Sequence, residues 1–262
     1  VVYGARIDRD IVMDSVLFDL NFACATMKSA SKIEFNKDMA QAMKSEICLY
    51  EGTYCKYRTL AENGKAADLE RANKYLAESV KASEAVMAAG YKLSADYHAI
   101  YNSTTLANNS EIIFYKPYEN TVFMHSLIAY TASSTQISGM TKDAFDAYLF
   151  KDGKPLALTS KDKSDVGEVD ADGNYNIKKL LDVRDARLSA TIDSIVYHDN
   201  MTWSRAGSME MTSSTGYGVC KYDNVTLPND SRVTTGKSYT AAPLYWLSVI
   251  YLNYAEAKAE LG

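Results

Sequence analysis

The sequence has 262 residues, enough for one large domain or two small ones with a sizeable hydrophobic core. Hydrophobic residues form 47% of it and charged residues 23%, which excludes a disordered chain, while the low counts of 13 Gly and 4 Pro favour long helices. A formal net charge of -5 excludes the overall basic field that a nucleic-acid-binding protein needs.

The N-terminal third carries apolar residues at spacings of three and four, the period of amphipathic helices. We expect a first helix over 10–32, a second from the cap residue Asn36 to near residue 60, and a third over 69–87 before a left-handed Gly90. The short connection over 61–67 predicts that the second and third form an antiparallel hairpin. The expected core-facing residues are, helix by helix, Val12, Val16, Leu20, Ala23, Met27 and Ala30; Met39, Met43, Ile47, Tyr50, Tyr54 and Tyr57; and Leu69, Ala72, Leu76, Val80, Ser83 and Met87.

Residues 91–240 are expected to form a loop-rich excursion with short elements. A buried strand is predicted over 111–117, ended by Pro117, and a short helix begins at the cap residue Thr141. The acidic run that starts at Asp170 lacks the Gly and Glu of a calcium loop, so we interpret it as a turn.

The last helix is predicted to open at Thr240 and Pro243 and to be buried on nearly every face, because apolar residues surround it. Such a helix needs a partner, so we expect a shortened C-terminus, and the missing initiator Met indicates a mature or cut-down N-terminus. The two stretches without charged residues, 121–141 and 238–255, are too polar for a membrane span, which predicts a soluble visible chain.

The cysteines are Cys24, Cys48, Cys55 and Cys220, and no pair has the spacing of a zinc or redox motif. We expect buried free thiols. The histidines His98, His125 and His198 are scattered and are expected to serve in packing or hydrogen bonding, so neither a metal nor a cofactor is predicted.

Sequence motifs for nucleotide binding, a serine nucleophile or a zinc protease are absent. The carboxylate pairs Asp143 with Asp146 and Asp182 with Asp185 could be proposed for glycoside hydrolysis, but spacing on one helix does not set their separation across a substrate. Catalysis by either carboxylate pair is therefore not predicted from the sequence.

Several segments together resemble one family. The hairpin over 36–90 contains Leu49-Tyr50-Glu51-Gly52-Thr53-Tyr54 and Val86-Met87-Ala88-Ala89-Gly90-Tyr91, and resembles a tetratricopeptide (TPR) unit. The last helix, with Leu252-Asn253-Tyr254-Ala255-Glu256-Ala257, resembles the first half of another. Between these two units lie Asp182-Val183-Arg184, Thr215-Gly216-Tyr217 and Lys221-Tyr222. Taken together, the sequence from about residue 10 to residue 262 is similar to the SusD/RagB family of outer-membrane nutrient-binding lipoproteins.

The resemblance implies a mainly α fold of TPR-like hairpins with long irregular loops and a few short strands. It divides a single partial domain, 1–262, into a helical scaffold over 10–90, a ligand-side excursion over 91–240 and the first helix of a further hairpin over 241–262. The implied function is non-catalytic binding of an oligosaccharide or polysaccharide at the surface of a Gram-negative cell. The implied partner is a TonB-dependent SusC-like transporter, and the implied membrane anchor is an N-terminal lipid. This sequence corresponds to about the middle half of such a protein, lacking N- and C-terminal parts.

Sugar rings stack on aromatic faces and hydrogen-bond to planar polar side chains on loops, so the densest aromatic cluster outside the helices is the candidate binding site. The alternative for each of these residues is packing. Asp182 and Arg184 are interpreted as a structural ion pair or cap. The candidates are Trp203 first, then Arg205, Tyr197, Tyr217 and Tyr222.

Two other functions stay open. A peptide-binding helical-repeat protein would use the groove of its TPR units, but a plain solenoid would not insert the long excursion over 91–240. A helical glycoside hydrolase would need two carboxylates converging across a cleft at roughly 5 to 10 Å.

Overall fold

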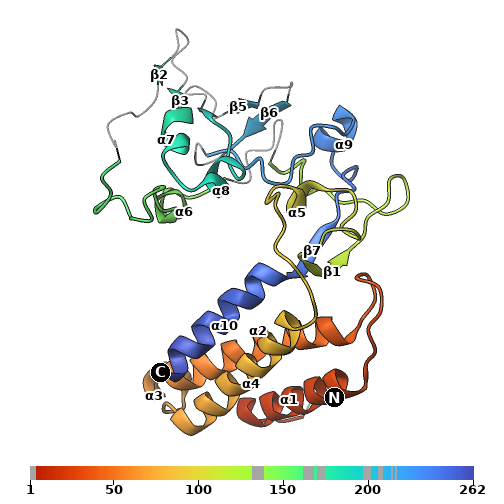
Figure 1. Cartoon of the computed structure of the whole chain (residues 1–262), viewed down its shortest axis with the longest axis vertical. Coiled ribbons are helices and arrows are strands. Elements are labelled where there is room, and N and C mark those ends of the chain that lie inside the picture. Colours follow the sequence, from red (N-terminus) through yellow and green to blue (C-terminus); the bar gives the residue numbers. More distant parts are fainter. Residues whose placement is uncertain are drawn as a thin grey trace. The chain divides into compact units, whose positions relative to one another are not determined.

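The computed structural model describes residues 4–131, 139–161, 168–169, 175–196, 202–205, 209–213, 215 and 217–262 (Figure 1). The chain forms two compact units. Unit 1 comprises Val1–Ser94, Leu106–Lys116 and Pro243–Gly262, and unit 2 comprises Ala95–Thr105 and Pro117–Ala242.

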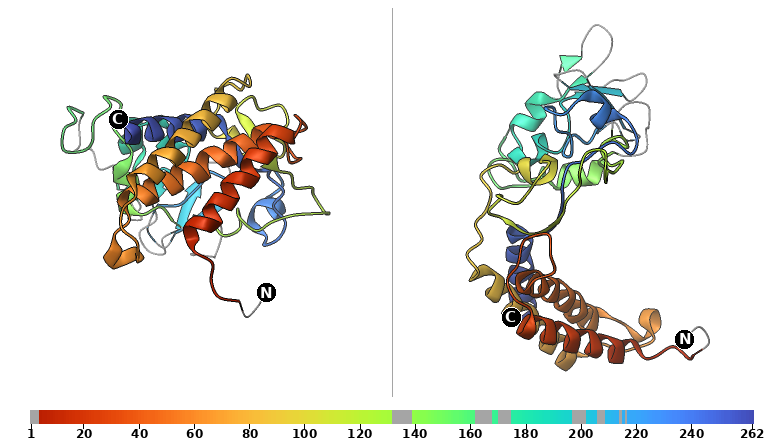
Figure 2. Two further views of the ribbon diagram at one scale, coloured as in Figure 1. Left: turned by 90° about the horizontal axis from the view of Figure 1, so that it is seen from below. Right: turned by 90° about the vertical axis from the view of Figure 1, so that its right-hand side faces the viewer.

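Unit 1 is a helical bundle with one small sheet. Helix α2 packs against both α1 and α4, and α10 packs against α4 and α2 (Figure 2). Its elements are α1 (Arg9–Thr26), α2 (Lys37–Tyr57), α3 (Leu60–Asn63), α4 (Leu69–Met87), β1 (Ile112–Lys116), β7 (Ala242–Trp246) and α10 (Leu247–Leu261).

The predicted hairpin of α2 and α4 is confirmed, as are the residues predicted to cap its two ends. The Asn36 side chain accepts a hydrogen bond from the Met39 amide at 2.9 Å, and Gly90 has the left-handed φ of 91°. The two helices run antiparallel, because Ser45 of α2 hydrogen-bonds to Ser83 near the end of α4, whereas Glu51 farther along α2 pairs with Arg71 near the start of α4. The connection holds the extra short helix α3, which the Thr59 side chain caps.

The predicted faces of α1 and α2 are partly wrong. Tyr50 and Tyr57 are each 63% exposed, and α2 instead buries small residues, which let it approach α4 closely. Helix α1 ends at Thr26 and not at residue 32, because Asn36 also donates hydrogen bonds to the Ser31 and Glu34 carbonyls and so fixes a turn there. The buried sets are Leu17, Leu20 and Cys24 on α1, and Ala42, Ser45, Cys48, Leu49, Gly52 and Cys55 among those on α2.

Gly52 marks the closest approach of α2 to α4. A Cβ built there would lie 2.6 Å from Leu76 Cγ and 3.1 Å from the Leu76 backbone nitrogen. The backbone contact cannot relax by a rotamer change, so Gly52→Ala is expected to lower the free energy of unfolding by about 1–3 kcal/mol despite the better helix propensity of alanine. Urea unfolding measures this. Thr53→Ala is the control and should change it by less than about 0.5 kcal/mol, and equal effects of the two variants would refute the close approach.

The buried strand β1 is confirmed, but 242–246 was predicted as helix and is strand β7, which pairs with β1. Glu111 explains where α10 starts. Its carbonyl accepts from the Leu247 amide at 3.0 Å and its carboxylate from the Ser248 amide at 3.3 Å, so the helix begins after the strand rather than at Pro243. The expected burial of α10 on nearly every face is also wrong, because Leu252 is 68% exposed.

Unit 2 consists of short elements joined by turns. Strands β2, β3 and β4 form one antiparallel sheet in that order, and β5 pairs antiparallel with β6. Its buried core includes Ile128, Phe145, Leu181, Leu188 and Ile192. The elements are α5 (Ala99–Asn102), α6 (Lys142–Ala147), β2 (Glu168–Val169), β3 (Tyr175–Asn176), α7 (Lys178–Asp182), α8 (Ala186–Ser189), β4 (Ile195–Val196), β5 (Thr202–Arg205), β6 (Met209–Thr212) and α9 (Asn229–Val233).

The predicted fold class, mainly α with TPR-like hairpins, long loops and a few short strands, is confirmed. The cysteines are buried free thiols, as expected. Among the helices that the structure describes, none combines the length and the apolar character that crossing a membrane requires. The finer division of 1–262 into scaffold, excursion and further hairpin stays a prediction.

Candidate functional site

An open pocket of about 380 Å³ lies in unit 2, and two tyrosines and an ion pair give it its chemical character. Tyr97 comes from the segment before α5, Tyr148 follows the end of α6, and Asp185 and Arg187 belong to the start of α8. Three separate segments therefore meet at the pocket. The lining is completed by Ala147 and Leu149.

Asp185 and Arg187 form a fixed pair within one helical turn. Asp185 caps α8, because its Oδ1 accepts from the Arg187 amide at 2.9 Å, and the same oxygen accepts from Arg187 Nε at 3.0 Å. Its Oδ2 accepts from Arg187 Nη2 at 2.5 Å. The hydrogen bond from Arg187 lowers the pKa of Asp185, so the carboxylate is charged at neutral pH. The pair is charge-balanced and still reaches solvent, with side-chain exposures of 62% for Arg187 and 28% for Asp185.

The tyrosine walls are held by neighbouring side chains. Tyr97 packs edge-on against Tyr101, with ring centroids 5.1 Å apart, and the Lys221 ammonium lies 3.6 Å from the Tyr101 centroid. The Tyr148 hydroxyl lies 3.5 Å from that of Thr191. Both pocket tyrosines are half-buried, so each side chain keeps part of its surface accessible.

This combination can bind a polyhydroxylated ring. An aromatic face takes up the C–H surface of the ring, and a guanidinium donates to hydroxyl oxygens while a carboxylate accepts from hydroxyl groups. The residues are positioned by capping and packing before any ligand arrives, which reduces the ordering cost of binding.

The structure describes the sequence-based site residues only in part, and they stay predictions. Trp203 and Arg205 lie on β5, opposite Met211 and Met209 of β6, but their side chains lie outside the described part of the chain, as does Tyr197 altogether. Tyr217 is half-buried and stacks on Phe145, with centroids 4.8 Å apart.

Tyr222 is likewise half-buried, and its ring meets that of Tyr101 edge-on at 6.3 Å. It therefore supports the same ring that supports Tyr97, and it does not line the pocket. The pocket tyrosines Tyr97 and Tyr148 are absent from the sequence-based candidates. Nothing local distinguishes them from the other tyrosines of a chain with 20.

Asp182 and Arg184 make structural ion pairs, but not with each other as the sequence indicated. Asp182 pairs with Lys178 at 2.6 Å, whereas the buried Arg184 lies 3.6 Å from Asp146. The reason is that α7 ends between them at Asp182, and Arg184 turns inward, where its guanidinium carbon lies 4.6 Å from the centroid of the Phe145 ring.

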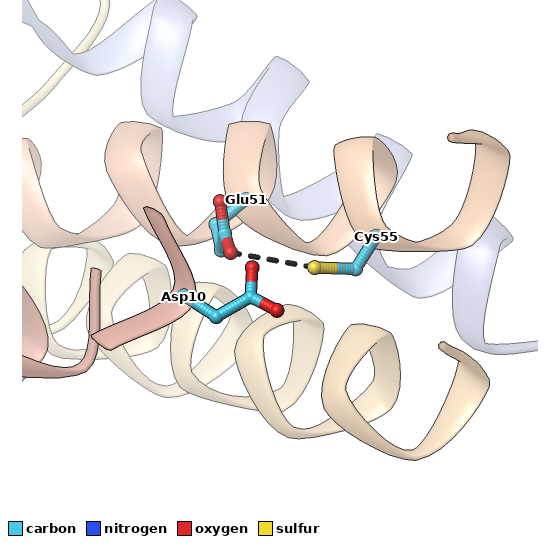
Figure 3. Close-up of side chains that lie close together, drawn as sticks. All are labelled: Asp10, Glu51 and Cys55. Carbon is cyan, nitrogen blue, oxygen red and sulfur yellow. Dashed lines mark hydrogen bonds between the residues drawn. The ribbon is translucent and has the colours of Figure 1, made fainter. Parts of the chain in front are cut away.

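A second cluster, in unit 1, has the composition of a metal site. One ligand atom each from Asp10, Glu51 and Cys55 lies within 4.8 Å of the others (Figure 3). The Cys55 thiol donates to Glu51 Oε1 at 3.3 Å, and burial raises its pKa to about 11, so the thiol is protonated at neutral pH.

Guanidinium and ammonium groups already balance these carboxylates. Arg58 Nη1 and Lys65 Nζ each lie 2.8 Å from Asp10, and Arg9 Nη1 lies 2.5 Å from Glu51. Burial alone would raise the pKa of Asp10, but the hydrogen bonds from Arg58 and Lys65 outweigh it and lower that pKa to about 2. The cluster is an ion-pair network that ties α1 to the hairpin.

The two described histidines serve as hydrogen-bonding residues, as expected. His98 Nε2 lies 3.3 Å from the Cys220 carbonyl oxygen, and His125 Nε2 lies 3.0 Å from that of Thr240. The third, His198, lies outside the described residues.

A helical-hairpin scaffold joined to a unit of short elements and long loops is the architecture that the sequence resemblance implied. The family model of the SusD family matches residues 83–262, more than half of the chain. The chain belongs to the SusD family. No curated protein matches it.

Solved structures share the fold. A SusD-like carbohydrate-binding protein from Bacteroides fragilis matches at 20% identity and a TM-score of 0.66, with 97% of this chain and 47% of that chain covered. A SusD superfamily protein from Parabacteroides distasonis matches at 19% identity and 0.53, with coverages of 97% and 46%. A structure determined with xylogluco-oligosaccharide matches at 15% identity and 0.54, with coverages of 94% and 44%. This chain therefore spans about half the length of these proteins.

Proposed function

We propose that this chain is part of a non-catalytic glycan-binding protein, and that the pocket formed by Tyr97, Tyr148, Asp185 and Arg187 contacts the sugar. The observation that carries the proposal is the convergence of two half-buried aromatic rings with a solvent-accessible ion pair at one pocket. Membership of the SusD family supports it, as does the similar structure determined with xylogluco-oligosaccharide.

The surroundings of three of the four candidate acids support a purely binding role. Hydrolysis of a glycosidic bond needs one carboxyl group that donates a proton and a second that acts as base or nucleophile. Asp146 pairs with Lys142 and Arg184, Asp182 pairs with Lys178, and Asp185 pairs with Arg187. For Asp185 the hydrogen bond from Arg187 lowers the pKa, which makes that carboxyl group a poor proton donor.

The cellular role is proposed from the family. The complete protein would be held at the outer surface of a Gram-negative outer membrane by an N-terminal lipid and would pass oligosaccharides to a TonB-dependent SusC-like transporter. The net charge of -5 agrees with a partner other than nucleic acid.

Affinity electrophoresis against soluble plant, host and microbial polysaccharides tests the binding claim. Tyr97→Ala is expected to abolish retardation by the polysaccharide that retards the wild type, because loss of a stacked ring costs an estimated 1–3 kcal/mol, or about tenfold to a hundredfold in affinity. The matched control is Tyr50→Ala. That tyrosine packs against Tyr54 four residues on, as Tyr97 packs against Tyr101, but it lies in unit 1.

Two further arms locate the site and test for catalysis. Trp203→Ala examines the sequence-based candidate, and loss of binding in that variant alone would move the site to the β5–β6 hairpin. Release of reducing ends during the same incubations would contradict the non-catalytic role. Equal retardation of Tyr97→Ala and wild type would remove the pocket from the proposal.

A further inference from the structure

We propose that the pocket is selective for uncharged glycans, and that Asp185 enforces this selection by occupying the guanidinium of Arg187. The inference rests on the proposed function, since it concerns the same pocket. It adds the charge class of the ligand and names the residue that determines it.

The pocket's formal charges cancel. Of the lining residues, Asp185 and Arg187 are the charged ones, and they contact each other at 2.5 Å. Asp146, next to the lining residue Ala147, faces Lys142 and Arg184. The nearby Lys221 ammonium lies over two rings, 3.6 Å from the Tyr101 centroid and 5.1 Å from the centroid of the pocket residue Tyr97.

The geometry of the pair disfavours an acidic sugar. A carboxylate binds arginine best through two parallel N–H···O bonds, and here Asp185 already accepts from Nε and Nη2. On the Nε/Nη2 edge a uronate would have to displace Asp185, and on the remaining Nη1/Nη2 edge it would share Nη2 with Asp185 and meet its negative charge across a short distance.

The geometry favours a neutral sugar for the complementary reason. Within the described chain the hydrogen bonds of the Arg187 guanidinium use Nε and Nη2, which leaves Nη1 to donate to a hydroxyl oxygen. A neighbouring hydroxyl of the same ring can donate to Asp185, so adjacent hydroxyl groups fit the two side chains together.

Asp185→Asn tests the proposal, because asparagine caps a helix as well as aspartate does and removes only the charge. The released guanidinium is expected to raise affinity for polygalacturonate and alginate about tenfold or more, in a manner that declines with added salt. The wild type is expected to bind neutral polysaccharides such as xyloglucan, laminarin or pullulan with little salt dependence, and the two acidic ones weakly or not at all.

Asp143→Asn is the matched control, since it removes one exposed negative charge from the first turn of another short helix in unit 2 and should leave both affinities unchanged. Arg187→Gln is the second variant and should weaken neutral binding without any gain for acidic chains.

Three results would overturn the selection. In the first, the wild type binds an acidic polysaccharide and the Arg187→Gln variant does not. This result refutes selectivity for uncharged glycans but leaves glycan binding at the pocket intact. In the second, a folded Asp185→Asn gains no acidic binding. In the third, polysaccharides of neither charge bind the wild type, and the proposed function fails together with the inference.

Discussion

Replacing Asp223 by alanine is expected to lower the free energy of unfolding by about 3–5 kcal/mol, because it leaves a buried charge without its partner. Asp223 accepts from Arg232 Nε at 2.7 Å and from Arg232 Nη2 at 2.8 Å. The two side chains are 0% and 3% exposed, so water cannot replace the lost carboxylate. Urea unfolding followed by fluorescence measures the change.

The Asp223→Ala substitution should also disturb the pocket. The Asp223 carbonyl accepts from Asn102 Nδ2 at 3.2 Å, and Asn224 Nδ2 donates to the Asn102 carbonyl at 2.9 Å, so this turn is fastened to the end of α5. The turn follows Lys221 and Tyr222, which contact the Tyr101 ring.

Asp230→Ala is the control for Asp223→Ala. Asp230 pairs with Lys237 at 2.6 Å, but its side chain is 60% exposed, and exposed pairs contribute less than about 1 kcal/mol. The double variant Asp223→Leu with Arg232→Met should recover most of the loss, because an apolar pair needs no compensation. A loss no larger than that of Asp230→Ala would contradict the buried pair.

Glu51→Ala is expected to destabilise unit 1 by a similar amount, about 3–5 kcal/mol. The Glu51 side chain is fully buried between Arg9, 2.5 Å away, and Arg71, 3.3 Å away. Its removal takes this carboxylate away from both guanidinium groups, of which Arg71 keeps Asp14 at 3.0 Å. Since Arg9 begins α1, we also expect faster proteolysis of that helix.

Thermal unfolding together with limited proteolysis checks this prediction. The control is Glu256→Ala, on an exposed position of α10, which should change stability by less than about 0.5 kcal/mol. A Glu51→Ala protein that keeps the wild-type stability would show that the ion pairs of Glu51, which is drawn in Figure 3, contribute nothing net to folding.

The sequence contained the local signals of the scaffold. Asn36 as a cap, Gly90 in the left-handed conformation and Pro117 after a buried strand each act within a few residues, so the hairpin and β1 could be predicted. The buried face of α2 could not, because the helix turns small residues such as Gly52 toward α4 and leaves Tyr50 in solvent. That choice depends on how closely two helices approach, which periodicity does not reveal.

The pocket was beyond prediction for a related reason. Tyr97, Tyr148 and Arg187 come from three segments whose meeting depends on packing in unit 2, and none carries a local motif. Likewise, β7 replaces the predicted start of a helix because residues 242–246 pair with β1, a segment far away in sequence.

A crystal structure with an oligosaccharide from the polysaccharide that retards the protein is the most direct test of glycan binding at the pocket. The account predicts a sugar ring against Tyr97 or Tyr148, with hydroxyl groups within hydrogen-bonding distance of Asp185 and Arg187. An oligosaccharide bound elsewhere on the chain, with no sugar in contact with these four residues, would contradict it.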